Sequence, residues 1–151
     1  MGRKASLTVP GRYSQIQRLC NFVAEGAQQA GFDEDEIFRV QLACDEACTN
    51  IIEHTYQGED QGMITVNWRI ETERFVIKIE DSGERFDPTD IPPPPPVPPP
   101  VDPVDDDFDI QVGGLGVFFM RQLMDAVTFS YEEGEGNVLT MIKQRPAGPS
   151  Q

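Results

Sequence analysis

Two stretches near the start of the chain carry apolar residues at the three- and four-residue spacing of an amphipathic helix. The first runs from Tyr13 to Ala30 and ends at Gly31, a residue type that commonly follows the last helical turn. The second runs from about Glu34 to about Tyr56. Asp33 indicates its start, because Glu36 follows three residues later and an Asp there can accept a hydrogen bond from a free backbone N–H. Its apolar stripe predicts the face that packs on a core: Ile37, Val40, Cys44, Ala47, Cys48, Ile51 and Thr55.

Alternation of apolar and polar residues predicts strands elsewhere in the chain. The clearest case is a pair of alternating segments joined by a short charged turn, which indicates a hairpin. A second hairpin closes the chain and turns through Glu-Glu-Gly-Glu-Gly-Asn, residues 132–137. A short strand is expected just before Pro10. The predicted strands are 6–9, 63–70, 75–80, 127–131 and 138–143.

These patterns predict an α/β (α+β) two-layer sandwich, because a helical stripe and half-buried strands must bury each other. We expect a mixed, mostly antiparallel sheet with three helices on one face. The third helix is a short apolar segment from Val117 to Met124. The length of 151 residues and the lack of an internal repeat predict a single domain over 1–151, with a frayed tail at 145–151.

The charge of the chain limits its partners. Twelve Lys and Arg against 26 Asp and Glu give a net charge of −14. Such a charge repels phosphate backbones and anionic membrane surfaces, so we expect no direct nucleic-acid binding and no membrane binding. No apolar run approaches the ~20 residues that a membrane helix needs.

The cysteines indicate a reducing compartment. There are three, at irregular spacing, which does not make a disulfide framework. Cys44 and Cys48 fall on the apolar stripe, so we expect buried thiols rather than a metal site with His54. The N-terminus has no apolar signal-peptide core, and a cytoplasmic location is the default interpretation.

Residues 88–112 interrupt the regular pattern with ten prolines, six aspartates and no Lys or Arg. The proline run at 92–100 favours an extended polyproline helix. It can serve as a stiff strut or as a ligand for a proline-recognition domain. A passive spacer is the interpretation we favour.

Three short polar motifs are candidates for chemistry. The first is Glu46 to Asn50 on the second helix, where residues four apart share a face. A carboxylate and a carboxamide placed together can act as a general base and a magnesium ligand. The helical pattern puts Glu46, Asn50 and Glu53 opposite the apolar stripe, so a solvated polar face is the alternative.

The other two motifs follow the predicted sheet. Asp81 comes at the end of a strand, where a carboxylate can accept a hydrogen bond from an exocyclic amine such as that of adenine, and Gly83 permits close backbone approach. An ordinary turn is the alternative. Gly113 to Gly116 precede a helix, and such a loop offers backbone N–H groups and the positive end of a dipole to a phosphate. A hinge explains the glycines as well.

Together and in this order, the motifs resemble those of the bacterial anti-sigma-factor serine/threonine kinases, within the Bergerat-fold (histidine-kinase-like) ATPase superfamily. The family pattern E-A-x-T-N followed by a His is present at 46–50 with His54, D-x-G-x-x-F-D-P at 81–88, and G-G-x-G-x-x-x-x-R at 113–121. The similarity covers most of the chain, including Leu-Thr-Val-Pro near its start and Asn137 to Thr140 near its end.

The resemblance implies ATP and Mg²⁺ as cofactors and assigns a role to each matching residue. Glu46 would be the general base and Asn50 the Mg²⁺ ligand. Asp81 would recognise the adenine amine, with Gly83 allowing close packing, and Thr140 would support the adenine contact. The loop that would bind the phosphates comprises Gly113, Gly114, Leu115, Gly116 and Val117.

The implied function is an anti-sigma regulatory kinase that transfers the γ-phosphoryl group of ATP to a Ser or Thr of an antagonist protein. A sigma factor is the alternative partner, and the family often forms homodimers. The segment 88–112 lies where the family has its ATP lid, yet it lacks a cation for the transferred phosphoryl group. Mg²⁺, Arg85, Arg121 or a partner would have to supply it. A nucleotide-binding partner switch without kinase activity is therefore the second hypothesis, and a scaffold that docks through the proline run is a third.

Overall fold

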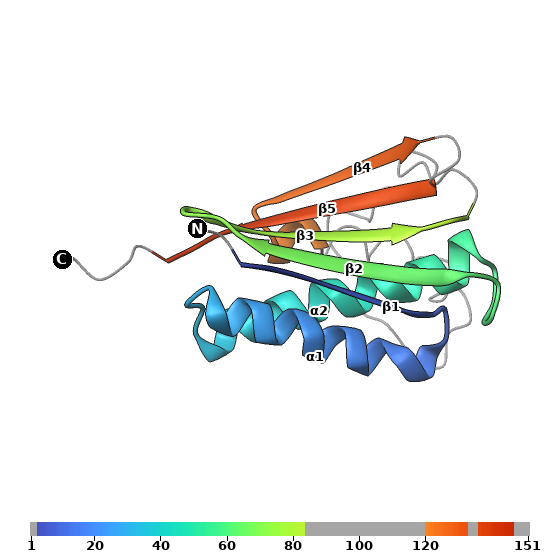
Figure 1. The fold of residues 1–151 in the computed structure, drawn as a ribbon, viewed down its shortest axis with the longest axis horizontal. Coiled ribbons are helices and arrows are strands. Elements are labelled where there is room, and N and C mark those ends of the chain that lie inside the picture. Colours follow the sequence, from blue (N-terminus) through green and yellow to red (C-terminus); the bar gives the residue numbers. More distant parts are fainter. Residues whose placement is uncertain (1–2, 84–119, 133–135, 147–151) are drawn as a thin grey trace, which may run out of the picture.

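The five strands form one sheet in the order β1-β2-β3-β5-β4, and every neighbouring pair is antiparallel (Figure 1). A computed structural model of the chain describes residues 3–83, 120–132 and 136–146. The expected α/β fold with a mostly antiparallel sheet is confirmed. The parallel pairing that a mixed sheet implies does not occur within these ranges. The strands are β1 (Lys4–Pro10), β2 (Met63–Ile70), β3 (Arg74–Asp81), β4 (Ala126–Glu132) and β5 (Gly136–Gln144).

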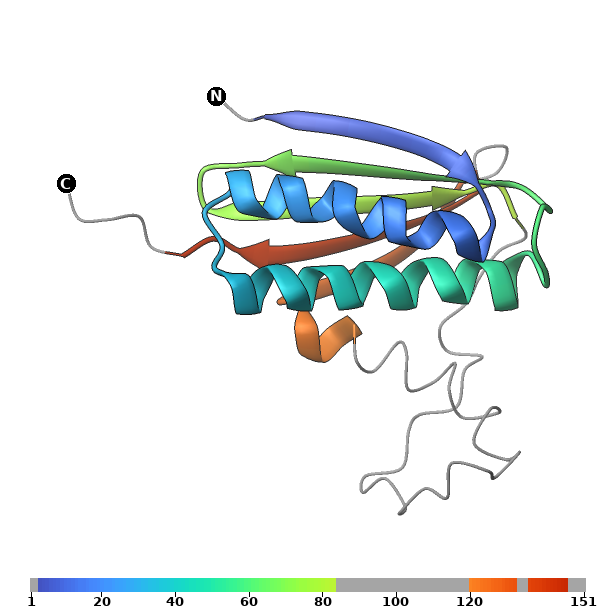
Figure 2. The same cartoon turned by 90° about the horizontal axis from the view of Figure 1, so that it is seen from below.

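The long helices α1 (Tyr13–Gln29) and α2 (Glu34–Asn50) both cover the same face of the sheet (Figure 2). The start of α2 is as predicted, since Asp33 Oδ1 accepts a hydrogen bond from the Glu36 backbone N at 2.8 Å. The last turn of the predicted second helix is a π-helical turn, η1 (Ile51–Thr55). Such turns occur often at functional sites.

A third helical segment at residues 120–123 lies beside α2, as the orange ribbon in Figure 2 shows. The start of the predicted helix at 117–119 lies outside the described residues. None of the described helices is long and apolar enough to cross a membrane.

The core lies between the helices and the inner face of the sheet. Trp68 of β2 rests on Gly26 of α1, where an added Cβ would collide with the indole ring. Its Nε1 donates a hydrogen bond to the Phe22 carbonyl at 3.1 Å, which satisfies the polar atom of a buried ring. Cys44 and Cys48 are buried, as predicted, with their sulfur atoms 3.9 Å apart.

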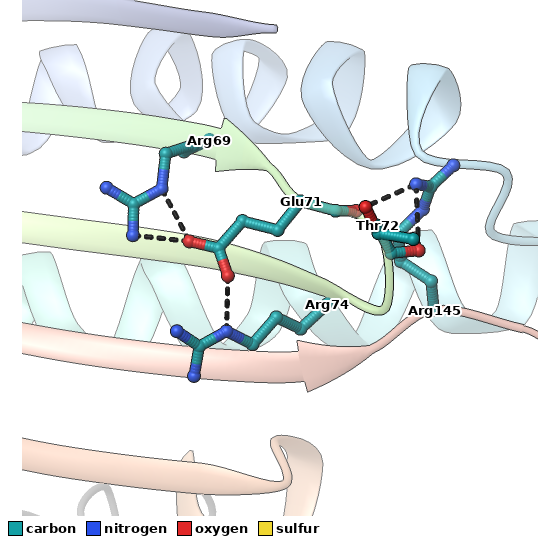
Figure 3. A network of polar contacts seen from close by, with 5 residues as sticks. All are labelled: Arg69, Glu71, Thr72, Arg74 and Arg145. Atoms are coloured by element: carbon teal, nitrogen blue, oxygen red, sulfur yellow. Dashed lines mark hydrogen bonds and ion pairs between the residues drawn. The ribbon is translucent and has the colours of Figure 1, made fainter. Parts of the chain in front are cut away.

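The C-terminal end of the described chain is anchored by Arg145 (Figure 3). Its backbone N donates to the Glu73 carbonyl at 2.9 Å, and its side chain donates to the carbonyls of Ala30 at 2.9 Å and Glu71 at 2.8 Å. The expectation of a frayed tail from residue 145 is therefore wrong for Arg145. Residues 147–151 lie outside the described residues.

Candidate functional site

A cavity opens on the helix-covered side of the sheet, where β3 and β5 face the end of α2. It holds about 370 Å³ of empty space, a figure that includes the part open to solvent. Its walls are mostly apolar and include Ile51 of η1 and Leu139 of β5. Its polar side chains include Asn50, Asp81 and Asn137, and each is more than nine-tenths buried. An apolar cavity with a few convergent polar groups is the general form of a small-molecule site.

Asp81 is the acidic group of this cavity. It is the last residue of β3 and is only 6% exposed. Its Oδ1 accepts hydrogen bonds from Asn137 Nδ2 and from the Gly83 backbone N, both at 2.9 Å. Burial raises the pKa of this carboxyl, and the hydrogen bonds from Asn137 and Gly83 act in the opposite direction. The Asn137 backbone also donates to this carboxyl. A carboxylate offers about four lone-pair sites, so these bonds leave room for a donor on a ligand.

The glycine at position 83 is explained by packing within the protein. An added Cβ would collide with the methyl group of Thr55 and press on the ring of Tyr56. The Tyr56 hydroxyl donates to the Met63 carbonyl at 2.5 Å and accepts from the Ser82 backbone N at 3.0 Å. The turn that follows Asp81 is thereby fixed against the end of η1. Gly83 itself does not line the cavity.

Asn50 lies on a different face of α2 from the one predicted. The helical pattern put it among solvated polar residues, but its side chain is 7% exposed and lines the cavity. The prediction was wrong because α2 is covered on three sides, by α1, by the sheet and by the helical segment at 120–123, so its buried face is wider than the apolar stripe. Within the described ranges, Asn50 Nδ2 has no hydrogen-bond partner. A buried amide group left unpaired costs free energy, which a ligand in the cavity would recover.

The residues present fit a nucleotide-bound Mg²⁺. No group of three or more His, Cys, Asp or Glu side chains gathers as a metal site in the part of the chain that the structure describes. Mg²⁺ that accompanies a nucleotide needs only one or two protein oxygens, because phosphates and water supply the rest. The Asn50 carboxamide carries one such oxygen beside a donor, and it lies in the cavity.

Glu46 lies one helical turn before Asn50 and is half-buried. It is not among the residues that line the cavity. Burial raises the pKa of its carboxyl, and the charges of Asp45 and Glu53 act in the same direction. A carboxylate with a raised pKa is better matched to proton transfer near neutral pH than an ordinary one.

Thr140 does not belong to the site. The register pairs it with Lys78 of β3 and Thr128 of β4, whereas Asp81 pairs with Asn137. Because side chains alternate between the two faces of a sheet, Thr140 lies on the face away from the helices. The expectation that Thr140 supports the adenine contact is therefore wrong.

Asn137 is the site residue that the sequence pattern missed. The alternation of apolar residues placed it in the turn before a strand at 138–143, but β5 already begins at Gly136. Gly136 has a φ of +98°, and an added Cβ would collide with the Asp81 carbonyl oxygen. Gly136 was the feature of the sequence that could have revealed Asn137. A glycine at this place can mark the close approach of two backbones as well as a turn.

The other candidate residues either lie outside the described residues or do not line the cavity. The phosphate-binding loop predicted at 113–117, Arg85 and the insertion at 88–112 lie outside the described residues. Arg121 is exposed on the helical segment at 120–123. His54 is exposed on η1 and does not line the cavity.

Comparison with known proteins identifies the family of this chain. The model of the histidine kinase-like ATPase domain family matches residues 9–143. The serine-protein kinase RsbW of Listeria monocytogenes serotype 4a (strain HCC23) is 32% identical over 142 residues, which cover 93% of this chain and 87% of the relative. The protein of the same name from Bacillus cereus (strain ATCC 10987 / NRS 248) is 29% identical over 142 residues, covering 94% of this chain and 86% of the relative. This chain therefore belongs to the histidine kinase-like ATPase domain family, in the branch that includes the bacterial serine-protein kinases RsbW.

Proposed function

We propose that this chain is an ATP-dependent serine/threonine protein kinase that acts as an anti-sigma regulatory factor. The observation that carries the proposal is the apolar cavity lined by both Asp81 and Asn50, whose amide nitrogen has no hydrogen-bond partner among the described residues. The serine-protein kinases to which the chain is similar over nearly its whole length support the reaction class.

In this proposal the cavity binds the adenine base. Asp81 accepts a hydrogen bond from the exocyclic amine, and the apolar walls, which include Ile51 and Leu139, cover the ring. The glycine-rich residues 113–117 bind the phosphates through backbone N–H groups. The oxygen of the Asn50 carboxamide ligates the Mg²⁺ that the triphosphate carries.

Glu46 is the proposed general base. When bound, Mg-ATP supplies the activated γ-phosphoryl group. Glu46 accepts the proton of the attacking Ser or Thr hydroxyl, for which its partial exposure and its raised pKa are suited. Asn50, one turn further along α2, would hold the metal, so one helix presents both groups.

The proposed partners follow from the reaction class. An antagonist protein presents the Ser or Thr that is phosphorylated, and a sigma factor is the partner in the alternative state. We propose a cytoplasmic location and a homodimeric assembly, in line with the family resemblance.

The test combines nucleotide binding with phosphotransfer. We expect calorimetry to show Mg-ATP binding by the wild-type chain, and affinity losses of at least about tenfold in Asp81→Asn and Asn50→Ala, because each removes a hydrogen bond or a metal contact. Radiolabelled ATP should phosphorylate an antagonist protein of the same organism, and Glu46→Gln should bind Mg-ATP but transfer at least about a hundredfold more slowly.

The outcomes separate two functions. Binding without transfer to any antagonist protein would favour a nucleotide-dependent partner switch, which the lack of Lys and Arg in residues 88–112 motivates. Unchanged transfer by Glu46→Gln would contradict the assignment of the base. No binding of Mg-ATP by the wild-type chain would contradict the proposed function itself.

A further inference from the structure

Two apolar side chains face solvent on α2, along the side of the helix that α1, the sheet and the helical segment at 120–123 leave uncovered. Phe38 is 58% exposed and Leu42 is 37% exposed. The two residues are four apart in the helix, so their side chains are neighbours on its surface. Phe38 has the greatest exposure of the large apolar side chains among the described residues. We call this pair the Phe38–Leu42 patch.

The other exposed large apolar side chains of the described chain lie singly. Tyr13 stands at the start of α1, Met63 at the start of β2 and Tyr131 near the end of β4. Tyr13 also has a polar contact, since its hydroxyl donates to Glu53 Oε1 at 3.2 Å. Single apolar residues are normal on a protein surface, whereas adjacent ones can mark a contact with another protein.

Acidic residues lie before and after the patch. Glu34 precedes Phe38 by four residues, and Asp45 follows Leu42 by three, so both adjoin the patch on the helix surface. Both are exposed, and within the described ranges no ion pair neutralises either carboxylate. Glu34 also stabilises the start of α2 through the helix dipole. Asp45 lies about three turns further on, so the dipole at the start of the helix does not explain it.

The basic residue of α2 does not reverse the sign of this face. The helix carries five acidic residues and one basic residue, Arg39. Arg39 lines a hollow together with Asp33, Asp35 and Glu36, whose charges offset its own. The whole chain has a net charge of −14. A protein that contacts this face is therefore favoured when it brings positive charge.

We propose that the Phe38–Leu42 patch is the docking surface for the protein that this kinase phosphorylates, and that the bound protein presents an apolar surface ringed by Lys or Arg. This inference rests on the proposed kinase function and names the surface that holds its protein substrate. A second copy of the chain would bring the same acidic face to the contact, so like charges disfavour it as the occupant.

The position of the patch suits this role. Glu46, the proposed general base, follows Leu42 by four residues on the same helix and is half-buried. One helical turn of this length advances about 6 Å along the axis, so a protein seated on the patch reaches the base without crossing another element. Neither Phe38 nor Leu42 lines the cavity, so docking leaves the proposed nucleotide site free.

The test is steady-state phosphorylation of an antagonist protein of the same organism by the full chain at saturating Mg-ATP. Phe38→Ser and Leu42→Ser should each raise KM for the antagonist at least about tenfold, because apolar anchors at the centre of an interface carry much of the affinity. The kcat should change by less than about twofold, since only uniform binding is lost. The wild-type KM should rise with NaCl between about 50 and 500 mM, because salt screens the surrounding charges.

Three measurements control for indirect effects. Calorimetry should show wild-type affinity for Mg-ATP in both serine variants. Phe38→Leu keeps an apolar side chain and should retain most of the wild-type affinity for the antagonist. Met63→Ser removes a side chain that is 47% exposed on the sheet face away from the helices, and it should leave KM unchanged.

An unchanged KM in folded Phe38→Ser and Leu42→Ser would overturn the inference while the observed phosphotransfer upholds the proposed function. An equal rise in KM for Met63→Ser, or a KM that salt does not affect, would overturn it as well. So would an unchanged KM together with lost affinity for a sigma factor, or with dissociation of a dimer in ultracentrifugation, since the patch would then hold another occupant. If the wild-type chain neither binds nor phosphorylates the antagonist, both the inference and the proposed kinase function are wrong.

Discussion

At the scale of single residues, burial of the Asn50 amide costs free energy in the ligand-free protein. Its amide nitrogen is buried and has no hydrogen-bond partner within the described residues, although polar atoms inside proteins are nearly always paired. An unpaired buried polar group costs about 1–3 kcal/mol. Since the cavity lies beside it, the cost is one that a bound ligand would relieve.

This cost predicts that removal of the amide stabilises the ligand-free protein and abolishes the binding of Mg-ATP. Asn50→Leu replaces the amide with an apolar group of similar shape, and the neighbouring cavity has room for the change. We expect the free energy of unfolding without ligand to rise by about 1 kcal/mol, measured by urea denaturation. Binding of Mg-ATP should be lost in the same variant, because a leucine can neither ligate the metal nor donate to a phosphate.

A matched variant at the same cavity sharpens the test. Asn137→Leu also removes a buried amide, but this amide donates to Asp81. It should destabilise the free protein by about 1–3 kcal/mol, because a buried carboxylate loses a donor. If both substitutions changed the free energy of unfolding in the same direction, the result would contradict our explanation of Asn50. In that explanation its buried amide destabilises the free protein because it has no partner among the described residues.

At the scale of elements, sequence periodicity was sufficient for the helices and most of each strand. It could not show that Asn50 is buried, because the spacing of apolar residues along a helix does not reveal how many other elements pack around that helix. It also missed Asn137, because β5 begins with a glycine and a polar residue that pattern rules assign to a turn. Both errors fall at the cavity, where polar residues replace the apolar ones that define a core.

The start of β5 gives a prediction with an internal control. At Gly136, φ is +98° and an added Cβ would collide with the Asp81 carbonyl oxygen. At Gly31, φ is +96° but nothing lies within 4 Å of the added atom. Gly31→Ala should therefore cost only the backbone strain of about 1 kcal/mol.

Gly136→Ala should cost at least about 2 kcal/mol more than Gly31→Ala in urea denaturation, because β5 must move away from Asp81. Its affinity for Mg-ATP should fall as well, since the Asn137 amide moves with the strand. Similar costs for the two alanines would show that the contact between β5 and Asp81 is looser than the structure indicates.

At the scale of the whole molecule, one residue joins three distant parts of the chain. Arg145 follows the last strand, and its side chain donates to the Ala30 carbonyl at the end of α1. It also donates to the carbonyls of Glu71 and Thr72 in the turn between β2 and β3 (Figure 3). The bond to Ala30 satisfies a free carbonyl at a helix C-terminus, where a cation is also favoured by the helix dipole. The helical layer and the sheet are thereby tied together at the end away from the cavity.

Arg145→Ala should lower the free energy of unfolding by about 2–3 kcal/mol, because it removes hydrogen bonds from a charged group to three carbonyls. Arg74→Ala is the control, since Arg74 pairs with Glu71 while its side chain is 49% exposed, and such an ion pair contributes about 0–1 kcal/mol. Both variants should bind Mg-ATP with wild-type affinity when folded, because neither residue lines the cavity. Equal stability losses in urea denaturation would mean that Arg145 is only another surface charge; a clear difference would mean that the end of β5 holds the two layers together.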